Sequence, residues 1–141
     1  MAWREDAHFT KLRVGSGSHN LTNNAHGADI TVGTEATNVI NVAIDLKDAS
    51  DRSLGVRNSL LAYLSTDATG DTLKSSDANL ASAIGTDGIL IELSADALFF
   101  LVSEADGDID IDFTKTDTGT FYLNLVLPNG SIVTSGAITF A

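Results

Sequence analysis

The sequence predicts an all-β fold, an antiparallel β-sandwich preceded by an extended N-terminal arm. About seven short apolar segments are separated by turn residues every 8–12 positions or so, which is typical of a sandwich. Asn129-Gly130 lies between two such segments and is a strong hairpin signal. Near residue 110, apolar and acidic residues alternate with the period of two of a half-buried strand. The apolar set is Ile109, Ile111 and Phe113, and the acidic set is Asp108, Asp110 and Asp112.

The first half of the predicted sandwich contains two strands and a long polar connection. Val42, Ile44 and Leu46 share one face of the first strand, and a second strand begins near Val56. The connection that follows contains Leu73 as its only apolar anchor. The segment 77–84 could form one helical turn, but no good C-cap precedes Gly85.

The second half contains five predicted strands. In the first, Ile89, Ile91 and Leu93 face the same way. The next segment, A-L-F-F-L-V, is apolar on both faces, as a central strand would be. Three closing strands are predicted near 108–115, 119–127 and 131–140.

Residues 1–36 differ in composition and predict the extended arm, which leaves 37–141 for the sandwich. The arm has a small, polar stretch at 15–27 without sustained periodicity. Its aromatic and basic side chains suggest a partner-binding segment, because aromatic residues carry much of the binding energy at interfaces. The alternative is that the arm folds back and Trp3 fills a gap in its own sandwich. The candidate contact residues are Trp3, Arg4, Phe9, Lys11, Leu12 and Arg13.

Composition limits the function classes. The 141 residues carry a formal net charge of −11 and include no cysteine. Such a surface repels nucleic acid and anionic membranes, so we expect neither as a partner. Without a thiol nucleophile, a G-x-S-x-G motif or a P-loop, we expect no enzyme and no cofactor. No apolar run approaches the roughly 20 residues of a membrane span.

Two sets of side chains suggest metal chemistry. A Ca²⁺ site at Glu104, Asp106 and Asp108 is one interpretation of the acidic run, because hard cations take clustered carboxylates. The other interpretation is a solvated strand face, because alternate residues on a strand project about 6.6–7 Å apart. A third is a salt-bridge face for a partner. The spacing of the three histidines, at positions 8, 19 and 26, matches no compact ligand motif.

Several segments resemble known families. V-A-I-D-L-K-D-A-S-D-R-S-L from Val42 and T-D-G-I-L-I-E-L from Thr86 resemble bacterial invasin-type immunoglobulin-like domains. I-G-T-D-G-I-L-I-E-L, L-V-S-E-A-D-G-D-I-D-I-D-F and F-Y-L-N-L-V-L-P-N-G-S-I-V-T-S-G-A-I-T-F-A are similar to small proteins encoded beside the major capsid protein of tailed bacteriophages. The resemblance covers residues 39–141 and implies an immunoglobulin-like sandwich.

The resemblance implies a capsid decoration (cement) protein or head-fibre protein. Such a protein binds the outer capsid surface of the virion after assembly in the host cytoplasm. Its partners would be the major capsid protein and further copies of itself, as a dimer or trimer. The alternative is a surface-exposed adhesive or carbohydrate-binding immunoglobulin-like module.

Overall fold

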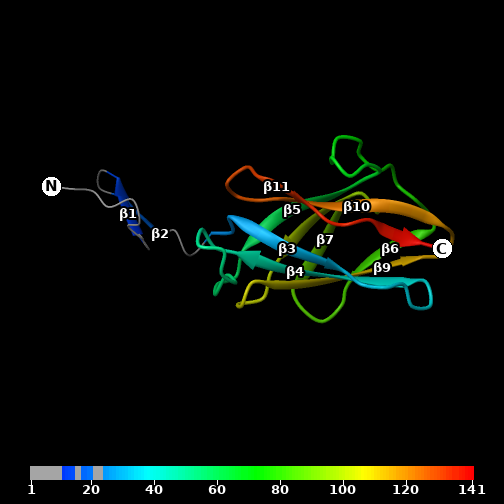
Figure 1. Ribbon diagram of the computed structural model, residues 1–141, viewed down its shortest axis with the longest axis horizontal. Coiled ribbons are helices and arrows are strands. Elements are labelled where there is room, and N and C mark those ends of the chain that lie inside the picture. Colours follow the sequence, from blue (N-terminus) through cyan, green and yellow to red (C-terminus); the bar gives the residue numbers. More distant parts are fainter. Residues whose placement is uncertain (1–10, 15–16, 21–23) are drawn as a thin grey trace.

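Ten strands form two antiparallel sheets that pack against each other, which confirms the predicted all-β class and the β-sandwich. The computed structural model describes residues 11–14, 17–20 and 24–141, and no helix occurs among them. The four-stranded sheet has the order β3 (Gly27–Val32), β4 (Val39–Lys47), β9 (Asp108–Lys115) and β6 (Leu80–Ile84). Figure 1 shows the strands of both sheets along the long axis of the molecule.

The six-stranded sheet is built around β10, which pairs with three other strands. Its order is β11 (Ile132–Thr134), β10 (Gly119–Val126), β5 (Ser59–Ser65), β8 (Leu98–Val102) and β7 (Ile89–Ser94). The last strand, β12 (Ile138–Phe140), pairs with the beginning of β10. The predicted strand at 131–140 is therefore two short strands.

Ser135 explains the interruption between β11 and β12. Its hydroxyl accepts a hydrogen bond from the amide of Leu123 at 2.9 Å, and its own amide donates to the Leu123 carbonyl at 2.8 Å. The Ser135 hydroxyl thus accepts the hydrogen bond that a backbone carbonyl would accept in a continuous strand pair. At the other end of β11, the predicted hairpin turn is confirmed, with Gly130 at a φ of 85°.

The core consists of the inward-facing residues of both sheets. Ile109, Ile111 and Phe113 on β9 are fully buried, as their alternation predicts. The Phe113 ring lies edge-on to Phe99 and Phe121, with centroid distances of 6.4 and 5.4 Å. Such aromatic pairs add to the stability that their buried area supplies.

The sandwich begins before the predicted boundary at residue 37. Strand β3 pairs along its whole length with β4, from Gly27 opposite Lys47 to Val32 opposite Val42. The segment 27–32, which the prediction assigned to the arm, is therefore an edge strand of the four-stranded sheet. The suggested helical turn near Leu80 was also wrong, because Leu80–Ile84 forms β6 against β9.

Two further predictions about apolar residues need correction. Leu73 does not anchor its loop, because 70% of the residue is exposed. Strand β8 is central in its sheet, but only Phe99 and Leu101 on one face are buried, and the other face is half-exposed.

The described part of the arm is a short hairpin. Strands β1 (Lys11–Val14) and β2 (Gly17–Asn20) pair antiparallel, with Lys11 opposite Asn20. In Figure 1 these two strands lie beyond one end of the sandwich. Residues 24–26 and 33–36 of the predicted arm flank β3, and Ala25 is buried in the core, whereas residues 1–10, 15–16 and 21–23 lie outside the described part.

Candidate binding surfaces

The outer face of the four-stranded sheet is acidic, and we call it the acidic face. Strand pairing places Asp29, Asp45 and Asp108 in one row across three strands. Asp110 and Asp112 continue along β9, and Asp87 lies beside them. All of these aspartates except Asp112, together with Thr31, Ala43 and Ile44, line an open hollow of about 450 Å³.

Lys47 is the basic residue of the acidic face. Its ammonium contacts the carboxylate of Asp45 and lies 3.3 Å from that of Asp29. The hydrogen bond to Asp45 is the largest of the effects that raise the pKa of Lys47. In the part of the chain that the structure describes, no cation pairs with Asp108, and desolvation followed by the charges of neighbouring aspartates raises its pKa. Lys47 thus compensates Asp29 and Asp45 on the acidic face, whereas Asp108 lies among carboxylates that disfavour its charged form.

The calcium candidates Glu104, Asp106 and Asp108 lie in a tight turn between β8 and β9. Within residues 24–141 and the two arm strands, no three acidic or histidine side chains are placed to hold an ion. Glu104 pairs with Arg57 at 3.0 Å. The turn is closed by its own backbone, since the Glu104 amide donates to the Asp108 carbonyl at 2.9 Å. Gly107 supplies the positive φ angle of this turn, with a value of 93°.

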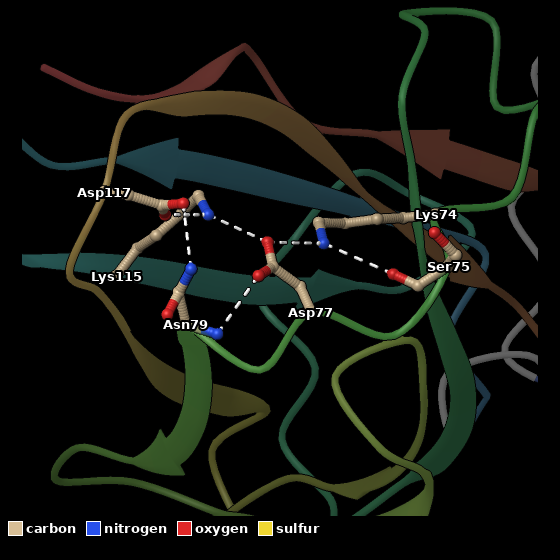
Figure 2. A network of polar contacts seen from close by, with 6 residues as sticks. All are labelled: Lys74, Ser75, Asp77, Asn79, Lys115 and Asp117. Atoms are coloured by element: carbon tan, nitrogen blue, oxygen red, sulfur yellow. Dashed lines mark hydrogen bonds and ion pairs between the residues drawn. The ribbon is translucent and has the colours of Figure 1, made fainter.

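A charged network lies at the end of the sandwich where β9 turns into β10 (Figure 2). Lys115 continues the buried register of Phe113, and only 4% of the residue is exposed. Its ammonium contacts Asp117 and donates to Asp77 at 2.8 Å. Lys74 donates to the same oxygen of Asp77 at 3.1 Å. One carboxylate thus joins two ammonium groups from separate parts of the chain.

The network shifts the titration of its members. The hydrogen bond from Lys115 is the largest effect lowering the pKa of Asp77, followed by one from the Asn79 amide. Lys115 likewise lowers the pKa of Asp117, and Asp117 raises that of Lys115. The net shifts favour the charged forms of all three groups, although desolvation opposes each of them. The network therefore links the 66–79 loop to the β9–β10 turn.

The 66–79 loop folds over part of the outer face of the six-stranded sheet. Asp67 accepts hydrogen bonds from the amides of Asp71 and Thr72 at 3.1 and 2.8 Å, which close the loop. Gly70 then approaches Asn124 and Tyr63 so closely that a Cβ would lie 2.6 Å from the Asn124 side-chain oxygen. The Tyr63 hydroxyl donates to the Gly70 carbonyl at 3.0 Å. The covered part of this face is therefore polar.

A continuous part of that outer face is apolar and not covered by the loop, and we call it the apolar face. Its central row crosses five paired strands. The row consists, in order, of Ile132, Val126, Leu61, Phe100 and Ile91. Ile89 and Val102 lie beside the row, opposite each other on β7 and β8. Ile89, Ile91 and Leu93 do face the same way, but outward, with exposures of 47, 50 and 53%.

The side chains of the predicted contact residues of the arm lie outside what the structure describes. Trp3, Arg4 and Phe9 lie outside the described part of the chain. Lys11, Leu12 and Arg13 belong to β1, where the structure describes the backbone alone. Of the histidines, only His26 has a described side chain, and its Nδ1 lies 3.2 Å from the Asn24 carbonyl.

The apolar face and the Lys115 network were missed as sites in the sequence. The signal for the first was strand 98–102, which is apolar on both faces although the sandwich has only one core. The signal for the second was a lysine in the buried register of β9, at a position where alternation expects an apolar residue.

Comparison with known proteins gives no relative for this chain. No protein-family model, no curated protein and no solved structure matches it. Within the described residues, no helix has the length and apolar character needed to cross a bilayer.

Proposed function

We propose that this chain is a capsid decoration (cement) protein that binds the outside of a phage head and bridges major capsid protein subunits. The observation that carries the proposal is the resemblance of the segments in 84–141 to proteins encoded beside the major capsid protein. These segments supply most of β7, β9 and β10 and all of β11 and β12, with Ile89, Ile91, Val102, Val126 and Ile132 of the apolar face. They also supply the aspartates of β9 on the acidic face.

The two faces support a protein-binding role. A cement gains affinity by making several moderate contacts at once, which requires wide surfaces on more than one side. The acidic face is on one side of the sandwich and the apolar face on the other. The charge of −11 also allows a basic segment to bind, and Arg4, Lys11 and Arg13 in the arm of a neighbouring copy offer one.

The test is co-sedimentation with decoration-free heads of the phage that encodes the chain. The full chain is compared with the double variant Trp3→Ala/Phe9→Ala. The matched control is Leu73→Ala, which removes an exposed apolar side chain from a loop outside both faces. The proposal predicts saturable binding at a fixed ratio to capsid subunits, unchanged in the control and weakened in the double variant.

Two outcomes would count against parts of this proposal. If the full chain does not sediment with expanded heads at any ratio, the cement function is wrong. Binding to a glycan array would then support the alternative of an adhesive module. If the full chain binds and the double variant binds equally well, the cement function stands, but Trp3 and Phe9 of the arm do not contribute to capsid binding.

A further inference from the structure

We propose that the apolar face is the contact surface for a second copy of this chain, which forms a two-fold, face-to-face dimer. The proposal goes beyond the cement function and does not depend on it. Its basis is the continuous row from Ile132 on β11 to Ile91 on β7, which crosses the whole sheet in register. Ile132, Leu61 and Ile91 in this row are exposed by 54, 42 and 50%.

The apolar face differs from the ordinary outer face of a sandwich. In an antiparallel sheet with one wet side, outward positions are polar, so that hydrophobic and polar residues alternate. Here, β7 and β8 place apolar residues at outward positions too, namely Ile89, Ile91, Phe100 and Val102. Contiguous exposed apolar patches of this kind mark interaction surfaces. The 66–79 loop covers the part of the face around Asn124 and Tyr63, and it lines a hollow together with Leu98 beside the apolar face.

Charge favours the apolar face as the surface through which two copies of this acidic chain meet. Two chains of charge −11 repel each other wherever their acidic residues meet. The seven residues of the apolar face carry no charge, whereas the acidic face has aspartates on β3, β4 and β9. Face-to-face packing of two sandwiches puts the two acidic faces about 30 Å apart, because stacked sheets are spaced by about 10 Å. That separation exceeds the Debye length of about 8 Å at physiological salt.

The dimensions of the face suit a dimer of moderate affinity. Five strands span about 19 Å between the outer strand axes, and Ile89 to Leu93 extends about 13 Å along β7. With the radii of the side chains, each copy offers roughly 450 Å². Two copies would bury roughly 900 Å², close to the lower limit of about 1,000 Å² for a specific interface. We therefore expect a micromolar, concentration-dependent dimer with Leu61, the middle of the row, near the two-fold axis.

The contact uses the face of the sheet and not its edge. Strand β7 forms one edge of the sheet, but its register with β8 shifts between Glu92 and Ser94. Such a bulge, together with the charge of Glu92, disfavours strand-to-strand pairing with another copy. The Glu92 carboxylate is also held by the Asp96 amide at 2.6 Å, away from the apolar face. The outward side chains of β7 remain available for face-to-face packing.

The test is sedimentation equilibrium of the full chain from micromolar to millimolar concentration, at physiological salt. Two variants, Ile91→Asp and Ile132→Asp, each place a charge at one end of the row. The matched control is Ala81→Asp, which adds the same charge at an exposed position on β6 of the opposite sheet. We expect a monomer–dimer equilibrium for the wild type and for Ala81→Asp, and dimers weakened about tenfold or more in the two row variants.

Circular dichroism checks that each variant keeps its strand content, since all three positions are exposed. A wild-type chain that stays monomeric over the whole range would overturn the proposal. So would a dimer that Ala81→Asp weakens as much as Ile91→Asp and Ile132→Asp do. None of these results depends on capsids, so failure here and failure of the cement function are separate outcomes.

Discussion

The two outer faces of the sandwich are built by the same alternation of residues, yet they have opposite chemistry. On β9, the outward positions from 108 to 112 are aspartates, and desolvation and the charges of neighbouring aspartates raise the pKa of Asp108. On β8, outward positions are Leu98, Phe100 and Val102, and no charge interrupts them. A period of two therefore identifies the buried side of a strand, but it does not predict whether solvent or a partner covers the other side.

The largest expected effect is a difference in stability between substitutions on the two sides of β8. Phe99 is fully buried, whereas its neighbour Phe100 points outward. Phe99→Ala should lower the free energy of unfolding by about 3–5 kcal/mol, because it leaves a cavity in the core. Phe100→Ala should cost about 1 kcal/mol in the dilute monomer. Urea unfolding at low concentration measures both, and equal losses would mean that the apolar face is covered within the monomer.

The second prediction concerns the one lysine in the buried register of β9. Lys115→Met should lower the free energy of unfolding by about 2–3 kcal/mol, because Asp77 and Asp117 lose the cation they share. Partial access of Asp77 to water keeps the loss below that of a fully buried pair. Lys47→Met on the acidic face is the control and should cost less, since Asp29 is largely exposed. An unchanged stability of Lys115→Met would contradict the structural role of the network.

The third prediction is a stability maximum in mild acid. The pKa of Asp108 is raised in the folded state, so folding takes up a proton and stability increases as pH falls from neutral. The pKa of Asp77 is lowered, so its stabilisation is complete above the ordinary value of 3.8 and is lost as pH falls below it. Thermal unfolding should therefore show a maximum at about pH 4–6. A melting temperature that falls steadily as the pH is lowered from neutral would contradict the raised pKa of Asp108.

The smallest expected effect is the relief of repulsion on the acidic face. Asp108→Asn should raise the free energy of unfolding by about 0.5 kcal/mol at neutral pH and low salt, and less at high salt. It should also flatten the rise in stability toward mild acid. Thermal melts at two salt concentrations measure the effect. A loss of stability in Asp108→Asn would mean that this carboxylate is stabilised by a partner within the fold.

The strands that could be predicted from the sequence are those with a long alternation of apolar and polar residues within one segment. Strand β9 has the predicted bounds, 108–115, because its alternation is long and its buried residues are large. Strand β3 was missed because Ala28, Ile30 and Val32 form a short, weak pattern after a polar stretch. Only pairing with β4 makes this segment a strand, and pairing is a tertiary effect.

The sites were harder to predict because they depend on distant partners. Lys115 is stable in a buried position only because Asp77, 38 residues away, meets its ammonium. The apolar face arises from registers between strands that are far apart in the chain, such as Leu61 opposite Phe100. Periodicity assigns each residue to a side, but it does not show which neighbours form a continuous row or whether anything covers them.

The measurement that tests the apolar face most directly is cross-linking through a single introduced cysteine. The natural chain has none, so Leu61→Cys carries the only thiol. A bismaleimide that spans about 10 Å, the spacing of packed sheets, should join two copies at Leu61→Cys. It should leave Ala81→Cys, on the opposite sheet, monomeric. Equal cross-linking at both positions, or none at Leu61→Cys at concentrations that saturate the dimer, would contradict the face-to-face dimer.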